Sequence, residues 1–331
     1  MQLSGETLVG EGSWLEREYE LTLQVKQLTL ESRRVMTIHL TTPDGRPLPP
    51  WKPGAHIDVH LGPSLLRQYS LCGDPQDLSH YRIGVLLEDQ SRGGSTFVHQ
   101  HLRPGDRVHV TGPRNRFALE AAQSYLFIAG GIGITALLAM IRACQAANHD
   151  WRLLYAGRER AAMPFTAELT SYGERVEFHA ADQGGRLDLA KVVDALQPGT
   201  EVYACGPETM LEELEELCRA QAAGVLHIER FKAKRREDTS ETSRPFDVVL
   251  QQSGVTVTVP PSCSILAELE RAGIDVPSSC REGICGTCEV TVLEGAPDHR
   301  DSLLSPEEQE AGTSMMVCVS RALSERLVLD I

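Results

Sequence analysis

The feature that most constrains this 331-residue chain is a set of four cysteines near its C-terminus. Three stand in the run SSCREGICGTCEV and the fourth in MMVCVS; they are Cys280, Cys285, Cys288 and Cys318. A spacing of four residues, then two, then a distant fourth thiolate is typical of a 2Fe–2S cluster site. Gly283 and Gly286 allow the backbone to wrap close to a cluster, with N–H groups pointing at its sulfur atoms.

A zinc site and a group of buried structural thiols are the two alternatives for these cysteines. Zinc sites with this many ligands usually pair two Cys-x-x-Cys or Cys/His knuckles. The C-terminal region holds one such knuckle, Cys285-Gly-Thr-Cys288. The pattern therefore favours the iron–sulfur cluster.

Length and composition predict a globular, multidomain chain. Residues of the apolar types make up 41% of it, and 331 residues can form two or three cores. The polar opening MQLSGETLVGEGSW has no signal-peptide pattern. The chain has nine cysteines, an odd number that cannot all pair as disulfides, which favours a reducing compartment. The uncharged run from Tyr125 to Ile141 contains a glycine cluster and is short for a bilayer, so it predicts a strand, a turn and a helix. We therefore expect a cytoplasmic protein outside the membrane.

The charge of the chain argues against nucleic acid as a partner. The net charge is −14, whereas nucleic-acid-binding proteins concentrate positive charge. Residues 246–331 hold 14 Asp and Glu against 5 Arg, a local net charge of −9. This acidity is either an ordinary solvated surface or a face that steers a basic redox partner.

Patterning divides the chain into three predicted domains. Short alternating runs separated by Pro/Gly turns predict an antiparallel β-barrel in residues 1–119. Alternating strand and helix patterns predict a parallel sheet in residues 120–231. The polar stretch 232–245 reads as a linker. Residues 246–331 begin with a hairpin and a short helix before the cysteines.

Two short motifs in the barrel segment are weak signals when each is taken alone. In LLRQYSLCG, Arg67 and Tyr69 could simply form an ion pair and a half-buried aromatic on a strand. In SRGGST, the glycines and hydroxyls from Arg92 to Thr96 could donate hydrogen bonds to a phosphate, or form an ordinary turn.

The parallel-sheet segment opens with a dinucleotide-binding pattern, AGGIGITA. Gly131-x-Gly133-x-x-Ala136 follows a predicted strand and begins a helix, where a pyrophosphate can approach backbone N–H groups. The acidic residue expected about 20 positions further on is missing, which disfavours an ordinary Rossmann dehydrogenase. Further along, Cys205-Gly-Pro207 follows another strand.

These motifs together resemble known families. CREGICGTCEV resembles the loop of plant-type 2Fe–2S ferredoxins, whose fold is a β-grasp, and the RQYS and GGIGIT runs resemble the ferredoxin reductase superfamily. The order of the domains is similar to that of the phthalate dioxygenase reductase and vanillate O-demethylase reductase family. The resemblance implies a Greek-key barrel, an α/β nucleotide-binding domain and an α+β ferredoxin domain.

The resemblance also implies the cofactors and their residues. FMN would contact Arg67 through its phosphate, Tyr69 through its ring and Ser70 near N5. The other implied flavin contacts are Leu71, Val85, Arg92, Gly93, Gly94, Ser95, Thr96, Thr135 and Phe231. NADH would lie along Gly130, Gly131, Gly133, Cys205, Gly206 and Pro207. No side chain is expected to act as a catalytic acid or base.

The implied function is that of an NADH-dependent reductase for a Rieske-type aromatic dioxygenase or O-demethylase, as a monomer. One alternative keeps the same electron path but serves a carnitine-type monooxygenase or a non-Rieske hydroxylase. A redox-sensing module is an alternative of a different class. NADPH is the alternative nucleotide, because Arg158 and Arg160 could pair with a 2′-phosphate.

Overall fold

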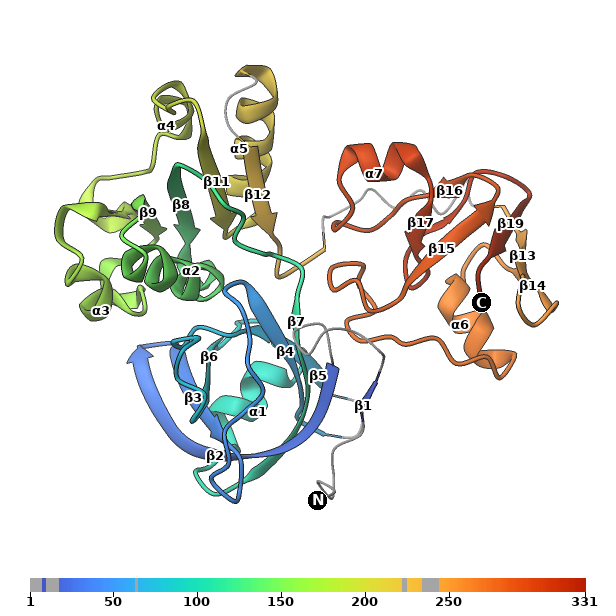
Figure 1. The fold of residues 1–331 in the computed structure, drawn as a ribbon, viewed down its shortest axis with the longest axis horizontal. Coiled ribbons are helices and arrows are strands. Elements are labelled where there is room, and N and C mark those ends of the chain that lie inside the picture. Colours follow the sequence, from blue (N-terminus) through green and yellow to red (C-terminus); the bar gives the residue numbers. More distant parts are fainter. Residues whose placement is uncertain (1–7, 10–17, 63–64, 222–224, 234–243) are drawn as a thin grey trace. The chain divides into compact units, whose positions relative to one another are not determined.

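The computed structural model describes residues 8–9, 18–62, 65–221, 225–233 and 244–331. They form two compact units, Met1–Glu229 and Arg230–Ile331, and each is described by itself (Figure 1). Most of the predicted linker, residues 234–243, lies outside the described residues. None of the described helices is both long and apolar enough to cross a membrane.

The first unit begins with an antiparallel sheet. Its described strands are β1 (Leu8–Val9), β2 (Glu18–Ser32), β3 (Val35–Thr41), β4 (Ala55–His60), β5 (Leu66–Ser70), β6 (Tyr81–Leu86) and β7 (Arg107–Asn115). The strand order is β5-β4-β7-β2-β3-β6, with β1 on β2. An isolated antiparallel bridge between Leu71 and Ile83 links the chain after β5 to β6. Helix α1 (Gly94–Gln100) precedes β7, and Ile57, Ile83 and Val110 are fully buried in the core.

A parallel sheet with helices on both faces completes this unit. Its strands are β8 (Ser124–Gly130), β9 (Asp150–Gly157), β10 (Val176–Ala180), β11 (Thr200–Cys205) and β12 (Val225–Glu229), in the order β10-β9-β8-β11-β12. The α-helices are α2 (Ile134–Ala146), α3 (Thr166–Thr170), α4 (Leu189–Asp194) and α5 (Glu208–Gln221). Short 3-10 turns are η1 (Gly131–Gly133), η2 (Arg160–Ala162), η3 (Gly173–Arg175) and η4 (Ala181–Gln183).

Helix α2 explains the long uncharged run in the sequence. Leu137 packs in the core of the parallel sheet, whereas Ala139 belongs to the core of the antiparallel sheet. Figure 1 shows α2 between these two layers. A helix covered on two sides has to be apolar nearly all round, so the predicted strand, turn and helix are confirmed for this stretch.

An ion network joins the two layers of the first unit. The Arg82 guanidinium on β6 pairs with Glu31 at 2.9 Å and with Glu168 on α3 at 3.0 Å. Arg142 on α2 pairs with Glu168 and donates to the carbonyl oxygens of Cys72 (2.6 Å) and Gly73 (2.7 Å). We call these contacts the Arg82–Glu168–Arg142 network; it links β6 to helices α2 and α3.

The second unit is built on a mixed five-stranded sheet in the order β14-β13-β19-β15-β17. These strands are β13 (Phe246–Leu250), β14 (Thr256–Val259), β15 (Glu289–Glu294), β17 (Ser314–Met316) and β19 (Arg326–Leu329), and a separate pair is β16 (Pro297–Asp298) with β18 (Arg321–Ala322). Its helices are α6 (Ile265–Arg271) and α7 (Pro306–Ala311). The hydroxyl of Ser264 caps α6, and a Ser305–Glu308 capping box begins α7.

Candidate cofactor sites

The four predicted cluster ligands lie in two pairs. A hydrogen bond joins the thiols of Cys280 and Cys285, and it lowers the pKa of Cys285 to about 5 while raising that of Cys280. Cys288 and Cys318 are joined in the same way. Within the described chain, no three His, Cys, Asp or Glu side chains gather at one ion-sized position. Two neighbouring pairs of thiols suit a two-iron cluster, in which each iron takes two thiolates.

The loop that carries three of these cysteines has an unusual backbone. Gly283 and Gly286 have φ angles of 70° and 76°, and Arg281 has 56°, in the left-handed region. This conformation turns N–H groups inward: Glu282 N–H donates to the Cys280 sulfur at 3.3 Å. A Cβ atom at Gly283 would lie 2.6 Å from Val319 Cγ2. The loop is therefore shaped to wrap around a group rich in sulfur.

In the first unit, the two predicted nucleotide motifs interlock at the carboxyl edge of the parallel sheet. A Cβ atom at Gly130 would lie 2.4 Å from Pro207 Cδ, and one at Gly133 would lie 2.2 Å from the Cys205 carbonyl oxygen. A Cβ atom at Gly206 would lie 2.9 Å from the Gly130 Cα. The glycines thus allow segment 130–133 to touch segment 205–207, and both segments lie where dinucleotides bind in such sheets.

A carboxylic acid that the sequence patterns did not indicate lies at the same edge. Ser70 Oγ donates to Glu229 Oε2 at 3.2 Å, and Glu229 is the register partner of Cys205 in β12 and β11. Burial of the Glu229 carboxyl raises its pKa to about 7. Burial, followed by the nearby Glu229 charge, raises the pKa of Cys205. No motif covers HIERF, so only strand pairing reveals Glu229.

The surroundings of Ser70 fit a flavin ring. His56 in β4 lies directly opposite Ser70 in β5 and is fully buried, which lowers the pKa of its imidazole to about 4. His56 Nε2 has no hydrogen-bond partner within the described structure. Directly paired residues project to the same face of a sheet. An unsatisfied buried nitrogen there would gain a partner from a flavin heteroatom.

Arg67 joins the RQYS motif to the predicted phosphate loop. Its guanidinium donates to the Arg92 carbonyl oxygen at 2.8 Å, and a Cβ at Gly94 would lie 2.7 Å from Arg67 Cγ. Ser91 Oγ accepts the N–H groups of Gly93 (3.1 Å) and Thr96 (3.3 Å), and Ser95 Oγ donates to it. Residues 94–96 form the first turn of α1. Three of the predicted phosphate donors therefore bond to Ser91.

Other predicted contact residues lie in varied surroundings. The side chains of Leu71 and Val85 are buried in the core, and the Val85 carbonyl bonds to His99 at 3.0 Å. The Thr135 hydroxyl donates to the Ile132 carbonyl at 2.9 Å. Tyr69 packs against the core of the antiparallel sheet, and Phe231 is exposed in the second unit. The flavin roles of these residues stay predictions.

The two arginines that could select NADPH lie after β9. The Arg160 guanidinium lies over the Phe178 ring at 3.7 Å, and its backbone N–H donates to Asp182 Oδ1 at 3.1 Å. Asp182 N–H in turn donates to the Arg158 carbonyl. The Asp182 carboxylate, which is held by the Arg160 backbone, opposes a second phosphate group nearby and suits ribose hydroxyls.

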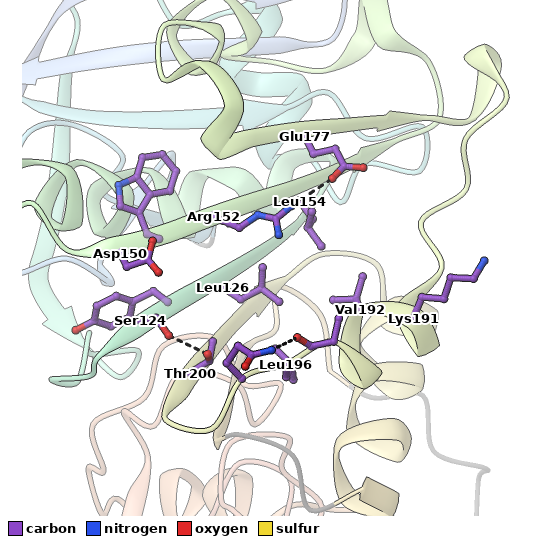
Figure 2. A pocket seen from close by; sticks show the side chains of 14 residues that line it. Ser124, Leu126, Asp150, Arg152, Leu154, Glu177, Lys191, Val192, Leu196 and Thr200 are labelled. Carbon is purple, nitrogen blue, oxygen red and sulfur yellow. Dashed lines mark hydrogen bonds and ion pairs between the residues drawn. The ribbon is translucent and has the colours of Figure 1, made fainter.

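A cavity of about 330 Å³ lies at the opposite edge of the parallel sheet, near the amino ends of β8, β9 and β11 (Figure 2). Its apolar lining includes Leu126, Leu154 and Leu196, and helix α4 forms one side. Because the glycine motifs follow the carboxyl ends of the strands, this cavity is separate from the predicted cofactor sites.

Comparison with known proteins identifies the domains. Residues 127–216 match the oxidoreductase NAD-binding domain family, and residues 248–323 match the 2Fe-2S iron-sulfur cluster binding domain family. The carnitine monooxygenase reductase subunit of Escherichia coli is 41% identical, over 93% of this chain and 98% of that protein. The solved structure of phthalate dioxygenase reductase is 37% identical, covering 94% of this chain and 98% of that one, with a TM-score of 0.69.

A further match is the full-length CYP116B46 of Tepidiphilus thermophilus, at 44% identity and a TM-score of 0.83. The match covers 94% of this chain but only 42% of that protein. The two domains and their sites define an oxidoreductase with an NAD-binding and a 2Fe–2S domain. The chain belongs to the phthalate dioxygenase reductase family, the reductase subunits of multicomponent oxygenase systems.

Proposed function

We propose that this chain passes electrons from NADH through FMN and its 2Fe–2S cluster to a Rieske-type terminal oxygenase that acts on an aromatic compound. The observation that carries the proposal is the junction of Ser70, Cys205 and Glu229, where the flavin motif of one layer meets the nucleotide motif of the other. The relative named phthalate dioxygenase reductase, which shares 37% identity, supports the aromatic oxygenase as acceptor.

The proposed mechanism assigns a task to each part of the chain. When bound, the cofactors accept a hydride as an electron pair and release the electrons singly to the acceptor. The interlocked segments 130–133 and 205–207 would hold the nucleotide, and Arg67 donates to the backbone of the phosphate loop. Ser70 connects Glu229 to the flavin side, and this carboxyl can hold or release a proton near pH 7.

We also propose the finer architecture. The Leu71–Ile83 bridge supports closure of the antiparallel sheet into a Greek-key barrel spanning residues 1–119. The mixed sheet with α6 supports a β-grasp fold for residues 246–331. Residues 120–231 would form the nucleotide domain and 232–245 the linker. The protein would work as a cytoplasmic monomer, where NADH is available.

The test has two stages. The purified protein should release FMN on heating, and FAD in its place would overturn the flavin assignment. It should also reduce cytochrome c with NADH over many turnovers each second. If it completes only a few turnovers, a redox-sensing module would be favoured. Oxygen uptake should then appear with a Rieske oxygenase and its aromatic acid. The kcat/KM ratio of NADH to NADPH should exceed one, because Asp182 lies beside Arg158 and Arg160.

A second candidate keeps the electron path but changes the acceptor. The carnitine monooxygenase reductase subunit is as similar to this chain as the aromatic oxygenase reductases are, at 41% identity. This chain also covers 41% of a solved type IV self-sufficient cytochrome P450 monooxygenase at 43% identity, so a similar module occurs joined to a cytochrome P450. Oxygen uptake with a carnitine oxygenase, and none with aromatic oxygenases, would favour the second candidate.

A further inference from the structure

A short segment between α7 and the cluster loop touches both halves of the cluster site. The N–H of Ser302 donates to the Gly283 carbonyl at 2.9 Å, within the loop that carries three cysteines. The N–H of Arg300 donates to Ser320 Oγ at 3.1 Å, two residues after the fourth cysteine. A Cβ atom at Gly283 would lie 2.9 Å from Asp301 Cα. Residues 299–304, the bracing segment, therefore hold the two ligand-bearing segments together.

Asp301 is the fully buried charged residue of the bracing segment. Its Oδ2 accepts the N–H groups of Leu303 (3.1 Å) and Leu304 (2.8 Å), which shapes the turn before α7. Its Oδ1 is buried without a hydrogen-bond partner in the described structure, and His299 Nδ1 is 3.8 Å away. A buried carboxylate oxygen without a donor is costly to fold. The turn alone needs only one acceptor oxygen, which an uncharged side chain could supply.

We propose that Asp301 is a positioning residue of the cluster site whose negative charge also lowers the reduction potential of the cluster. Its backbone packs on Gly283, which lies in the loop between Cys280 and Cys285, and the neighbouring Ser302 N–H donates to the Gly283 carbonyl. The contacts thus run from the bracing segment through Gly283 to the loop that carries the ligands. Reduction adds one negative charge to the cluster, and a fixed buried anion nearby opposes that addition because charges interact strongly at low dielectric. A lower potential makes the reduced cluster a stronger donor to its acceptor.

The test compares two amide substitutions in the full-length protein. Asp301→Asn keeps the acceptor oxygen for the turn but removes the charge. The matched control is Asp298→Asn, three residues away, where the carboxylate is 24% exposed and pairs with Arg300 at 2.7 Å. The reduction potential is measured by a redox titration followed by EPR of the reduced cluster, together with iron and sulfide content.

We expect Asp301→Asn to retain the cluster, to shift the potential upward and to slow reduction of a low-potential acceptor dye. Asp298→Asn should shift it less, because solvent and Arg300 already screen that charge. An unchanged potential in Asp301→Asn, at full cluster content, would overturn the proposal. If that variant holds no cluster, Asp301→Ser supplies a neutral acceptor for the turn, and the same outcomes apply to it.

This inference rests on the cluster of the proposed function, and the two can fail separately. A native protein without iron and sulfide would refute the cluster itself. If the native protein holds a full cluster and replacement of Asp301 leaves the reduction potential unchanged, only the electrostatic role would be refuted. Loss of the cluster in Asp301→Ala, with retention in Asp301→Asn, would support the positioning role.

Discussion

The nucleotide loop, residues 130–135, and the cluster loop, residues 280–288, are both rich in glycine, but Gly130 and Gly133 in the first are required for a different reason from Gly286 in the second. Gly130 and Gly133 have negative φ angles of −117° and −57°, which any residue can adopt. Neighbouring backbone blocks a side chain at Gly133. In the cluster loop, Gly286 has a φ of 76°, which itself favours glycine. A glycine-rich motif can thus encode close approach or a turned backbone, and the sequence alone does not say which.

The largest expected effect separates the chemistry of the two loops. Cys285→Ser removes a cluster ligand, so the iron–sulfur absorbance and cytochrome c reduction should disappear. Reduction of the flavin by NADH should continue at nearly the native rate, because the nucleotide loop lies in the other compact unit. Stopped-flow absorbance measures both events. Loss of both would mean that the second unit is required for folding of the first.

The next effect compares two glycines within the nucleotide loop. Gly133→Ala places a methyl group 2.2 Å from the Cys205 carbonyl, and overpacking of this kind costs about 1–3 kcal/mol. We expect a lower melting temperature and weaker NADH binding. Gly131→Ala is the comparison: its Cβ would meet open space, so its cost, about 1–2 kcal/mol, comes from its φ of 54° alone. An unchanged melting temperature in Gly133→Ala would argue against close approach as the function of Gly133.

Glu229 provides a pH test of the junction beside this loop. Its folded-state pKa, about 7, lies above the ordinary value of 4.5, so the folded protein holds this proton more tightly. The native chain should therefore lose stability as pH rises from about 4.5 through about 7, by up to about 3 kcal/mol. Glu229→Gln should lack this contribution. The difference in melting temperature should be small at pH 5 and should favour Gln at pH 8; parallel pH curves would contradict the assignment.

The smallest effect concerns the acidic surface of the second unit, which an acceptor protein would meet as it approaches the cluster loop. Residues 246–331 carry a local charge of −9, and Glu307, Glu308 and Glu310 are exposed on α7. If this acidity steers the oxygenase, intermolecular electron transfer should slow as salt rises, because charges are screened beyond about 8 Å at physiological ionic strength. Electron transfer within the chain should hardly change. If the rate of intermolecular electron transfer did not depend on salt, these carboxylates would serve only the solubility of the protein.

Much of the fold could be predicted because the patterns were local. The alternation of strands and helices from Ser124 to Gln221 and the β13–β14 hairpin are confirmed. Helices α1 and α4 were not predicted: α1 begins with two small residues of a loop-like motif, SRGGST, and α4 has only six residues. In such short helices tertiary packing outweighs intrinsic propensity.

The site residues likewise fall into those that a local sequence pattern revealed and those that only the structure revealed. Cysteine spacing and the glycine patterns gave the two motif-bearing loops, because their ligands or turns lie close in the chain. Glu229 and Asp301 could not be found in this way. Glu229 meets Ser70 across 159 positions, and Asp301 meets Gly283 through a packing contact. Neither contact leaves a periodicity or a spacing that a single sequence displays.

The Arg82–Glu168–Arg142 network has a consequence for how the first unit unfolds. Glu168 satisfies two guanidinium groups, one from each layer, and Arg142 also holds the carbonyl oxygens after β5. Opening the seam between the layers would leave several charged groups without partners at once. The antiparallel and parallel sheets should therefore melt in a single cooperative transition, and the flavin motif of one layer and the nucleotide motif of the other should reach their relative positions during folding.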